Sequence, residues 1–123
     1  MYLLSVETKI STAHRLRDYN GPCARIHGHN WKIRLEVQSA IADEKGIVLD
    51  FTTLEHYLHQ VTGPFDHQLM NDVSPFDVMN PTAENLAKYI YDRVEKLLPD
   101  QIKMKKVNVW ETDRYMVSYE GKQ

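Results

Sequence analysis

The 123-residue chain contains a single cysteine, Cys23. One thiol cannot form a disulfide within the chain, so a secreted scaffold held together by several disulfides is excluded. The lone thiol favours a reducing compartment, and we expect the protein in the cytoplasm. At roughly 150 residues per domain, the length predicts one domain spanning residues 1–123.

Long apolar runs are also missing. No stretch approaches the roughly 20 apolar residues of a membrane helix, and the first residues lack the basic and apolar regions of a targeting signal. The 15 Lys and Arg stand against 17 Asp and Glu, which gives a net charge of -2. This balance argues against a main role in binding nucleic acid or anionic lipid. Hydrophobic residues make up 42% of the chain, enough for one packed core.

Alternating apolar residues predict the strands. Between residues 30 and 38 every second residue is apolar, which is typical of a half-buried strand. The β-branched residues of segment 2–13 predict its antiparallel neighbour, and the connection 15–26 is long enough to carry function. Alternation over 106–111, followed by a polar turn and residues 116–119, predicts a closing hairpin.

Helical spacing occurs twice between the two strand pairs. One apolar stripe runs from Phe51 to Val61, after a potential cap at Asp50, and a second runs from Leu86 to Leu98. The order strand, strand, helix, helix, strand, strand predicts an α+β fold in which two helices cover one face of a four-stranded antiparallel sheet. The uncovered face and the sheet edges favour a closed, symmetric homo-oligomer.

Three histidines near strand ends are candidate metal ligands. Residues two apart on a strand point to the same face about 6.6 Å apart, so His27 and His29 can reach one ion. An isolated His-x-His pattern also fits two ordinary strand-end histidines. Strand pairing would bring His14 beside them, and three neutral imidazoles suit zinc with a fourth position open to water or substrate. Cys23 is the alternative fourth ligand, and it would close a structural site.

Cys23 and the pair Asp66-His67 are candidate proton-transfer groups. Cys23 lies beside Arg25 and near the predicted metal ion, and both positive charges favour the thiolate form of its side chain. A lone cysteine is, however, as often a small buried apolar residue. Asp66 can set the tautomer and basicity of His67. Adjacent Asp and His residues are, however, commonly just polar loop residues.

Glu111 and Thr82 are candidate binding residues. Glu111 is in phase with the apolar Val107 and Val109, where an unpaired charge is costly. A ligand with two adjacent N–H donors would satisfy this carboxylate, and an exposed strand end is the simpler explanation. Thr82 is most simply a helix cap, with ligand contact at that helix start as the alternative. The remaining histidines, His56 and His59, are expected to be solvated.

Taken together, these motifs resemble the 6-pyruvoyltetrahydropterin synthase / 6-carboxytetrahydropterin synthase family, which has the tunnelling fold. The matching motifs, in chain order, are Ala13-His14-Arg15-Leu16, Cys23-x3-His27-Gly28-His29-Asn30, Phe65-Asp66-His67, Asn80-Pro81-Thr82-Ala83-Glu84-Asn85 and Glu111-Thr112. The resemblance covers nearly the whole chain. It implies trimers stacked into hexamers, with active sites shared between subunits.

The resemblance also implies a role for each site residue. One Zn2+ per subunit would bind to His14, His27 and His29, with Cys23 as the proton-abstracting base, His67 and its partner Asp66 as a relay, and Glu111 as the anchor of the pterin ring. Further candidate substrate contacts are Thr82 and, for a triphosphate, Arg15, Arg25 and Lys9.

The spacing between Cys23 and His27 indicates the branch of the family. Three intervening residues resemble the bacterial 6-carboxytetrahydropterin synthases of queuosine biosynthesis, whereas pyruvoyl-forming relatives typically have a longer spacing. This branch implies a zinc-dependent lyase that converts 7,8-dihydroneopterin triphosphate to 6-carboxy-5,6,7,8-tetrahydropterin, acetaldehyde and triphosphate.

Two departures from this branch keep alternatives open. Phe65 stands where leucine is usual, and Glu111-Thr112-Asp113 also resembles the pyruvoyl-forming branch, so a 6-pyruvoyltetrahydropterin synthase is the alternative. A third branch forms 6-hydroxymethyldihydropterin with a glutamate base, and Cys23 argues against it. A non-catalytic module stabilised by zinc, with Cys23 as the fourth ligand, is the remaining alternative.

Overall fold

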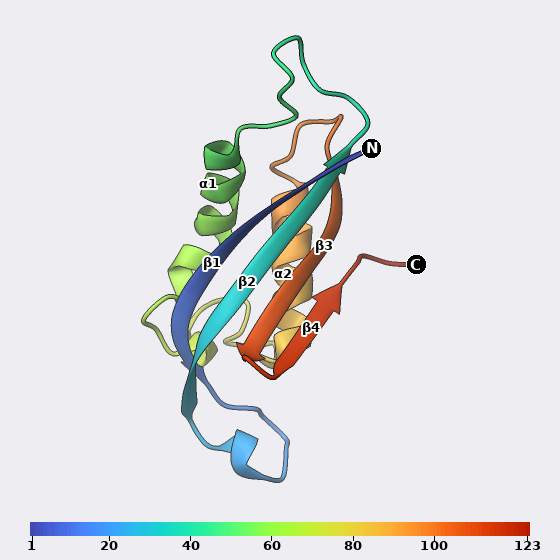
Figure 1. The fold of residues 1–123 in the computed structure, drawn as a ribbon. Coiled ribbons are helices and arrows are strands. Elements are labelled where there is room, and N and C mark those ends of the chain that lie inside the picture. The colour runs from blue at the N-terminus through green and yellow to red at the C-terminus, as the bar shows by residue number, and fades with distance from the viewer.

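A four-stranded antiparallel sheet forms one layer of the protein, and two helices form the other (Figure 1). The computed structural model describes all of residues 1–123. In the order β1-β2-β3-β4, the strands are β1 (Tyr2–His14), β2 (His27–Ser39), β3 (Lys103–Thr112) and β4 (Tyr115–Tyr119). The helices are α1 (Phe51–Thr62) and α2 (Ala83–Glu95), and the short 3-10 helices are Pro22–Ala24, Gly63–Phe65 and Met70–Asp72. The predicted α+β architecture and element order are confirmed.

The core lies between the sheet and the two helices. Every second residue of β2 from Trp31 to Val37 is fully buried, as the alternation predicts. Leu54 and Leu58 of α1 and Ile90 of α2 are equally buried, and each such side chain contributes about 1.5–3 kcal/mol of transfer free energy. Phe51, which the sequence places on the apolar stripe of α1, is instead 60% exposed in the first turn of the helix.

The first two strands are longer than the alternation predicts. Their register runs from Tyr2 opposite Ser39 to His14 opposite His27, so the His27-Gly28-His29 motif lies inside β2 and not ahead of it. The apolar alternation does not reveal these last pairs, because the buried face there carries histidines in place of apolar side chains. The long pairing fixes where the histidines lie relative to the core.

The two helices begin differently. Thr82 caps α2, because its Oγ1 accepts a hydrogen bond of 3.0 Å from the Asn85 N–H, which confirms the predicted cap. Asp50 stands at the corresponding position of α1, but its side chain makes no capping hydrogen bond, so that cap prediction is wrong. Gly63 ends α1, and the chain continues directly into the 3-10 helix Gly63–Phe65.

Two asparagine side chains hold the connection between β1 and β2 in place. The Asn71 side chain accepts from the Arg15 N–H at 2.9 Å and donates to the Arg15 carbonyl at 3.0 Å. Asn80 makes the same pair of contacts with Arg17, at 2.8 Å and 3.5 Å. Each side-chain amide therefore pairs with one backbone N–H and one carbonyl, as a neighbouring strand would. These contacts attach the connection between β1 and β2 to the segment between the two helices.

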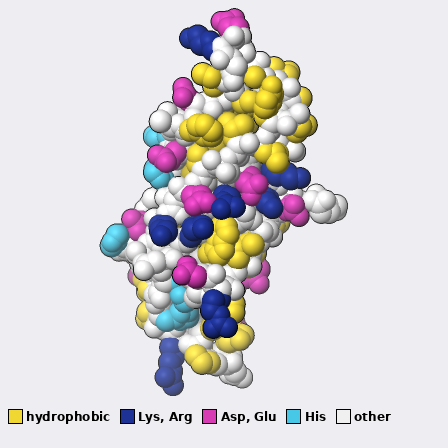
Figure 2. All heavy atoms as spheres, in the orientation of Figure 1, with side chains coloured by type: hydrophobic (Ala, Val, Ile, Leu, Met, Phe, Trp, Pro, Cys, Tyr) yellow, Lys and Arg dark blue, Asp and Glu magenta, His cyan; other side chains and the backbone are white.

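The sheet face opposite the helices is charged. Figure 2 shows basic and acidic side chains gathered across its middle. Arg34 donates two hydrogen bonds to Glu7, at 2.8 Å and 2.7 Å, and the Lys32 ammonium lies 4.4 Å from the centre of the Trp110 ring. Neither helix has the length and apolar content that crossing a membrane requires. The homo-oligomer stays a prediction.

Candidate metal centre and its cavity

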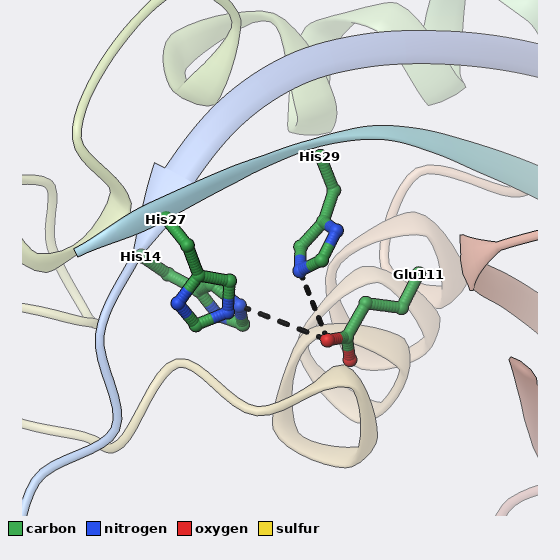
Figure 3. A group of neighbouring side chains, drawn as sticks. All are labelled: His14, His27, His29 and Glu111. Atoms are coloured by element: carbon green, nitrogen blue, oxygen red, sulfur yellow. Dashed lines mark ion pairs between the residues drawn. The ribbon is translucent and has the colours of Figure 1, made fainter. Parts of the chain in front are cut away.

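Three histidines and one glutamate converge at one end of the sheet (Figure 3). His14 ends β1, His27 is paired with it at the start of β2, and His29 follows two residues later on the same face. The three imidazole centroids lie 4.5–5.3 Å apart. Together with Glu111, each residue offers one ligand atom, and the four atoms all lie within 4.8 Å of one another.

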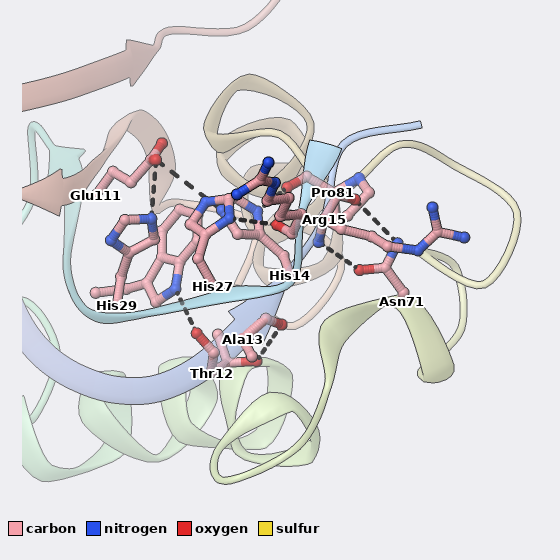
Figure 4. Close-up of polar contacts among 11 residues, drawn as sticks. Thr12, Ala13, His14, Arg15, His27, His29, Asn71, Pro81 and Glu111 are labelled. Carbon is pink, nitrogen blue, oxygen red and sulfur yellow. Dashed lines mark hydrogen bonds and ion pairs between the residues drawn. The ribbon is translucent and has the colours of Figure 1, made fainter. Parts of the chain in front are cut away.

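Backbone carbonyls orient two of these imidazoles (Figure 4). The Nδ1 atom of His14 lies 2.7 Å from the Pro81 carbonyl oxygen, and the Nδ1 atom of His27 lies 2.7 Å from the Arg25 carbonyl oxygen. A carbonyl oxygen only accepts hydrogen bonds, so Nδ1 must carry the proton in both rings. The lone pair is then left on Nε2, which is the arrangement that metal-binding histidines use.

The Nε2 atoms of His14 and His29 are buried and have no hydrogen-bond partner. A buried polar atom without a partner costs about 1–3 kcal/mol, and a bound cation removes that cost. Burial is also the largest influence on the pKa of both imidazoles, and it lowers each below its usual range. Burial therefore favours the neutral form of both rings. Three imidazoles with an adjacent carboxylate fit a zinc-type ion.

Glu111 completes the group. Its Oε1 lies 3.0 Å from His29 Nε2 and 3.9 Å from His14 Nε2, without the geometry of a hydrogen bond. The carboxylate is 29% exposed. The sequence suggests either an external ligand or an exposed strand end, and it misses this histidine neighbourhood. This neighbourhood follows from the pairing of β3 with β2: Val109 lies opposite Ile33, so Glu111, two residues further along β3, lies on the face of the sheet that carries the histidines.

Trp31 packs against two of the imidazoles. The sequence does not suggest this role, because the alternation simply assigns Trp31 to the core. Its ring centroid lies 4.9 Å from that of His14 and 5.4 Å from that of His29. The indole N–H donates to the Thr12 carbonyl at 3.2 Å, and the residue is fully buried. Trp31 therefore restricts the positions that both imidazoles can take. Pro81 is the second supporting residue that sequence reasoning misses.

A cavity of about 290 Å³ adjoins His14 and Glu111 of this group. Its lining includes Cys23, His14, Thr82, Glu84 and Glu111. Cys23 is partly buried and carries a free thiol, and it is not one of the four residues whose ligand atoms cluster. The thiol therefore faces the same cavity as the metal group without belonging to it.

Asp66 and His67 lie elsewhere. His67 is 80% exposed and lines a second hollow, of about 470 Å³, together with His29 and residues of β1. Asp66 accepts a hydrogen bond of 2.8 Å from the Ser11 N–H, which is the main reason that its pKa lies below the usual range, and His67 Nδ1 contributes at 3.1 Å. The two side chains are in contact, but the cavity that Cys23 lines does not include His67.

The candidate triphosphate contacts are not gathered around Cys23. Arg15 and Arg25 are exposed, lie outside the lining of its cavity and have no carboxylate partner within salt-bridge distance. Lys9 lies next to the buried Ile10 on β1, so its side chain points to the open face of the sheet, away from the histidines. Thr82 does line the cavity.

Comparisons with known proteins agree with this geometry. The sequence model of the family described as "6-pyruvoyl tetrahydropterin synthase" matches residues 3–122. The human 6-pyruvoyl tetrahydrobiopterin synthase is 34% identical over 120 residues, which cover 96% of this chain and 79% of that protein. The 6-carboxy-5,6,7,8-tetrahydropterin synthase of Bacillus subtilis is 35% identical over 100 residues, which cover 77% of this chain and 66% of that protein.

Two further relatives widen the comparison. A dihydroneopterin monophosphate aldolase of Pyrococcus furiosus is 34% identical over 95 residues, which cover 77% of this chain and 78% of that protein. The structure of the Caenorhabditis elegans 6-pyruvoyl tetrahydropterin synthase superposes with a TM-score of 0.86 at 25% identity, and the match covers 99% of this chain and 98% of the other. The predicted tunnelling fold and the prediction of an enzyme are confirmed. The chain belongs to the 6-pyruvoyl tetrahydropterin synthase family.

Proposed function

We propose that this enzyme is a zinc-dependent 6-carboxy-5,6,7,8-tetrahydropterin synthase. It converts 7,8-dihydroneopterin triphosphate to 6-carboxytetrahydropterin, acetaldehyde and triphosphate. The observation that carries the proposal is the position of Cys23, which lines one cavity with His14 and Glu111 and yet is not part of the four-residue metal group. A thiol in that position is free to move a proton beside a bound cation, whose charge favours the thiolate.

The chain's own residues divide the work between binding and proton transfer. His14, His27 and His29 would hold the zinc ion, which would supply Lewis acidity to the substrate's side-chain hydroxyl groups. Glu111 accepts hydrogen bonds from the pterin ring N–H and amino group, which fixes the side chain of the substrate beside the histidines. Cys23 removes a proton from the side-chain carbon.

Asp66 and His67 complete the site from a neighbouring subunit. His67 handles a hydroxyl proton, with Asp66 setting its orientation. His67 and Cys23 line different cavities of one chain, and we propose that the complete site requires a second copy of the chain to contribute His67. This requirement supports a homo-oligomer, either a trimer or a dimer of trimers, with active sites between subunits.

Thr82, Arg15 and Arg25 are available to contact the parts of the substrate outside the pterin ring. The Thr82 oxygen already accepts the Asn85 N–H, so its hydroxyl hydrogen remains free to donate to a ligand in the cavity. Arg15 and Arg25 are exposed and unpaired cations on the connection that carries Cys23, which suits a triphosphate outside the cavity. Lys9 would reach it only from another subunit.

The two branches differ in how many side-chain carbons the product keeps, and the spacing between Cys23 and His27 helps to choose between them. Acetaldehyde removes two of the three side-chain carbons and leaves one as the carboxyl group, whereas a pyruvoyl product keeps all three. The three-residue spacing before His27 and the Bacillus subtilis relative support the carboxy product. The human relative and Glu111-Thr112-Asp113 support the alternative, a 6-pyruvoyltetrahydropterin synthase. We place the carboxy product in queuosine biosynthesis, in the cytoplasm, where a thiolate stays reduced.

Product analysis tests the proposal. Purified zinc-loaded protein is incubated with 7,8-dihydroneopterin triphosphate, the volatile aldehyde is trapped as a hydrazone, and the pterin is identified by mass spectrometry. We expect acetaldehyde and 6-carboxytetrahydropterin in equal amounts. A pyruvoyl pterin without acetaldehyde would select the alternative branch, and 6-hydroxymethyldihydropterin would select the third branch of the family.

A Cys23→Ala variant separates catalysis from a purely structural zinc site. Because Cys23 is outside the metal group, the variant should retain one zinc per chain, keep its thermal stability and lose turnover. Loss of zinc together with loss of stability would instead identify Cys23 as a ligand of a closed, non-catalytic site. Zinc content by atomic emission and the melting temperature provide the two measurements.

A further inference from the structure

Tyr19 lines the same cavity as Cys23 and Glu111. The residue is 52% exposed, so it lies at the rim of the cavity. It is the only Phe, Tyr or Trp among the lining residues. An aromatic side chain at the edge of a concave site contributes a large contact area at a low cost in conformational entropy, because only two side-chain torsions are fixed. The cavity therefore offers a ligand one such aromatic surface.

The backbone of the connection between β1 and β2 brings Tyr19 to this position. The Leu16 N–H donates a hydrogen bond of 2.8 Å to the Cys23 carbonyl, which closes residues 16–23 into a loop. Within the loop Asp18 has a φ of 53° and Gly21 a φ of 144°, both in the left-handed region. A positive φ is uncommon for a residue with a Cβ atom such as Asp18, and such conformations cluster at functional sites. Tyr19 lies between these two turning points.

Two further contacts restrict where the Tyr19 ring can lie. A Cβ atom at position 21 would lie 3.3 Å from Tyr19 Cε1, so the lack of a side chain at Gly21 lets the ring lie close to the backbone. On the other side of Tyr19, the Arg17 N–H donates to the Asn80 side chain at 2.8 Å. The Arg17 guanidinium also donates to two backbone carbonyls, at 2.9 Å and 2.7 Å. The loop therefore holds Tyr19 between two fixed points.

The proposed substrate needs a contact that the other lining residues of this chain do not supply. Hydrogen bonds from the pterin ring to Glu111 lie in the plane of the ring and leave both of its faces uncovered. A flat conjugated ring is bound on its face by offset stacking with an aromatic side chain. Of the residues that line the cavity, Tyr19 has the six-membered aromatic ring that this contact requires.

We infer that Tyr19 stacks on the pterin ring of the substrate. The ring is then held at its edge by Glu111 and on one face by Tyr19, while Cys23 lies on the same loop as the stacking residue. The contact uses the face of the phenol ring and does not need its hydroxyl group. This inference rests on the proposed function, because a substrate without a planar ring would not use the contact.

Pterin binding without turnover tests the inference. Zinc-loaded protein is titrated with neopterin and, in parallel, with unsubstituted pterin, which has the ring and lacks the side chain. The fluorescence of the pterin reports the dissociation constant. The variants are Tyr19→Ala, Tyr19→Phe and Gly21→Ala. The control is Tyr2→Ala, which truncates a tyrosine of the same 52% exposure at the far end of β1 from His14. Zinc content and melting temperature are measured for every variant.

The expected results separate the ring face from other contacts. Tyr19→Ala should bind both ligands about three- to tenfold more weakly, which is the contribution of one aromatic pair, and should keep its zinc and its melting temperature. Tyr19→Phe should bind like the wild-type protein because it keeps the ring. Gly21→Ala should also bind both ligands more weakly, because its Cβ atom displaces the ring. Tyr2→Ala should bind both like the wild-type protein.

Three results would overturn the inference and leave the product analysis above unaffected. Wild-type affinity in Tyr19→Ala would mean that the ligand does not use the ring. Equal weakening in Tyr19→Phe and Tyr19→Ala would assign the effect to the hydroxyl group. Weaker binding of neopterin alone would place Tyr19 against the side chain of the ligand. A wild-type protein that binds neither ligand would instead count against the proposed substrate, and the inference would fail with it.

Discussion

Replacing Asn71 by alanine tests how the connection carrying Cys23 is held. The Asn71 amide is 8% exposed and exchanges two hydrogen bonds with the backbone of Arg15, at 2.9 Å and 3.0 Å. Each such bond contributes about 0.5–1.5 kcal/mol, so Asn71→Ala should lower the free energy of unfolding by about 1–3 kcal/mol. For a chain of this size, that corresponds to a melting temperature lower by roughly 4–12 °C.

Asn80→Ala is the matched comparison. Asn80 makes the same pair of contacts with Arg17, but its donor bond is 3.5 Å long and its side chain is only partly buried. A long, partly solvated hydrogen bond contributes less, so Asn80→Ala should destabilise the protein by less than Asn71→Ala. Both variants are measured by urea unfolding, followed by circular dichroism, with chelator present so that metal binding does not add to the stability.

The order of the two effects is what tests the reasoning. An Asn71→Ala protein within about 0.5 kcal/mol of the wild-type protein would mean that water replaces the amide at no cost, as at ordinary surface positions. A larger effect for Asn80→Ala would mean that the contacts of the Arg17 side chain, at 2.9 Å and 2.7 Å to the Met79 and Phe76 carbonyls, depend on Asn80. Either result would refute the ranking by burial and distance.

Three further predictions address other regions. Trp31→Phe removes the donor to the Thr12 carbonyl and part of the floor under two imidazoles, so urea unfolding should give a loss of about 1–3 kcal/mol. Gly121→Ala should cost more than Gly46→Ala in the same assay, because both have a positive φ, of 86° and 82°, but only the Cβ at 121 would meet another atom, Tyr91 Oη at 2.7 Å. The pKa of Asp66 is lowered from 3.8 in the folded protein, so its ionised carboxylate stabilises the fold fully above pH 3.8, and this contribution is lost as the pH falls through the lower folded pKa. The urea midpoint of unfolding should therefore fall less steeply with decreasing pH in Asp66→Asn than in the wild-type protein.

The fold could be predicted well because its signals are local and repetitive. Alternation in β2 and the helical stripe of α2 reflect burial against one core, and the structure confirms both. The errors lie at the ends of elements. Asp50 precedes α1 without capping it, and the strands extend to His14 and His27 because their last pairs are held by backbone hydrogen bonds that leave no apolar pattern.

The site was predicted less completely, because much of it depends on contacts between distant segments. His14, His27 and His29 share a motif spacing and a strand pairing, so the sequence suggests their proximity. The Pro81 carbonyl that contacts His14 Nδ1 lies 67 positions away in the sequence, and no local sequence pattern indicates this contact. The sequence indicates that Glu111 is an unpaired charge on the apolar side of its strand, but its approach to the histidines depends on the pairing of β3 with β2.

The hydrophobic core also determines the geometry of the metal group. His14 lies on the same face of β1 as Ile10, and His27 and His29 lie on the same face of β2 as Ile33, since all of these positions are an even number of residues apart. A slip of one residue along β1 would turn Ile10 out of the core and His14 toward the charged open face. The free energy of burying the apolar side chains therefore opposes any register that would separate the ligands. The packing of the sheet on the helices therefore sets the positions of these side chains without any bound ion.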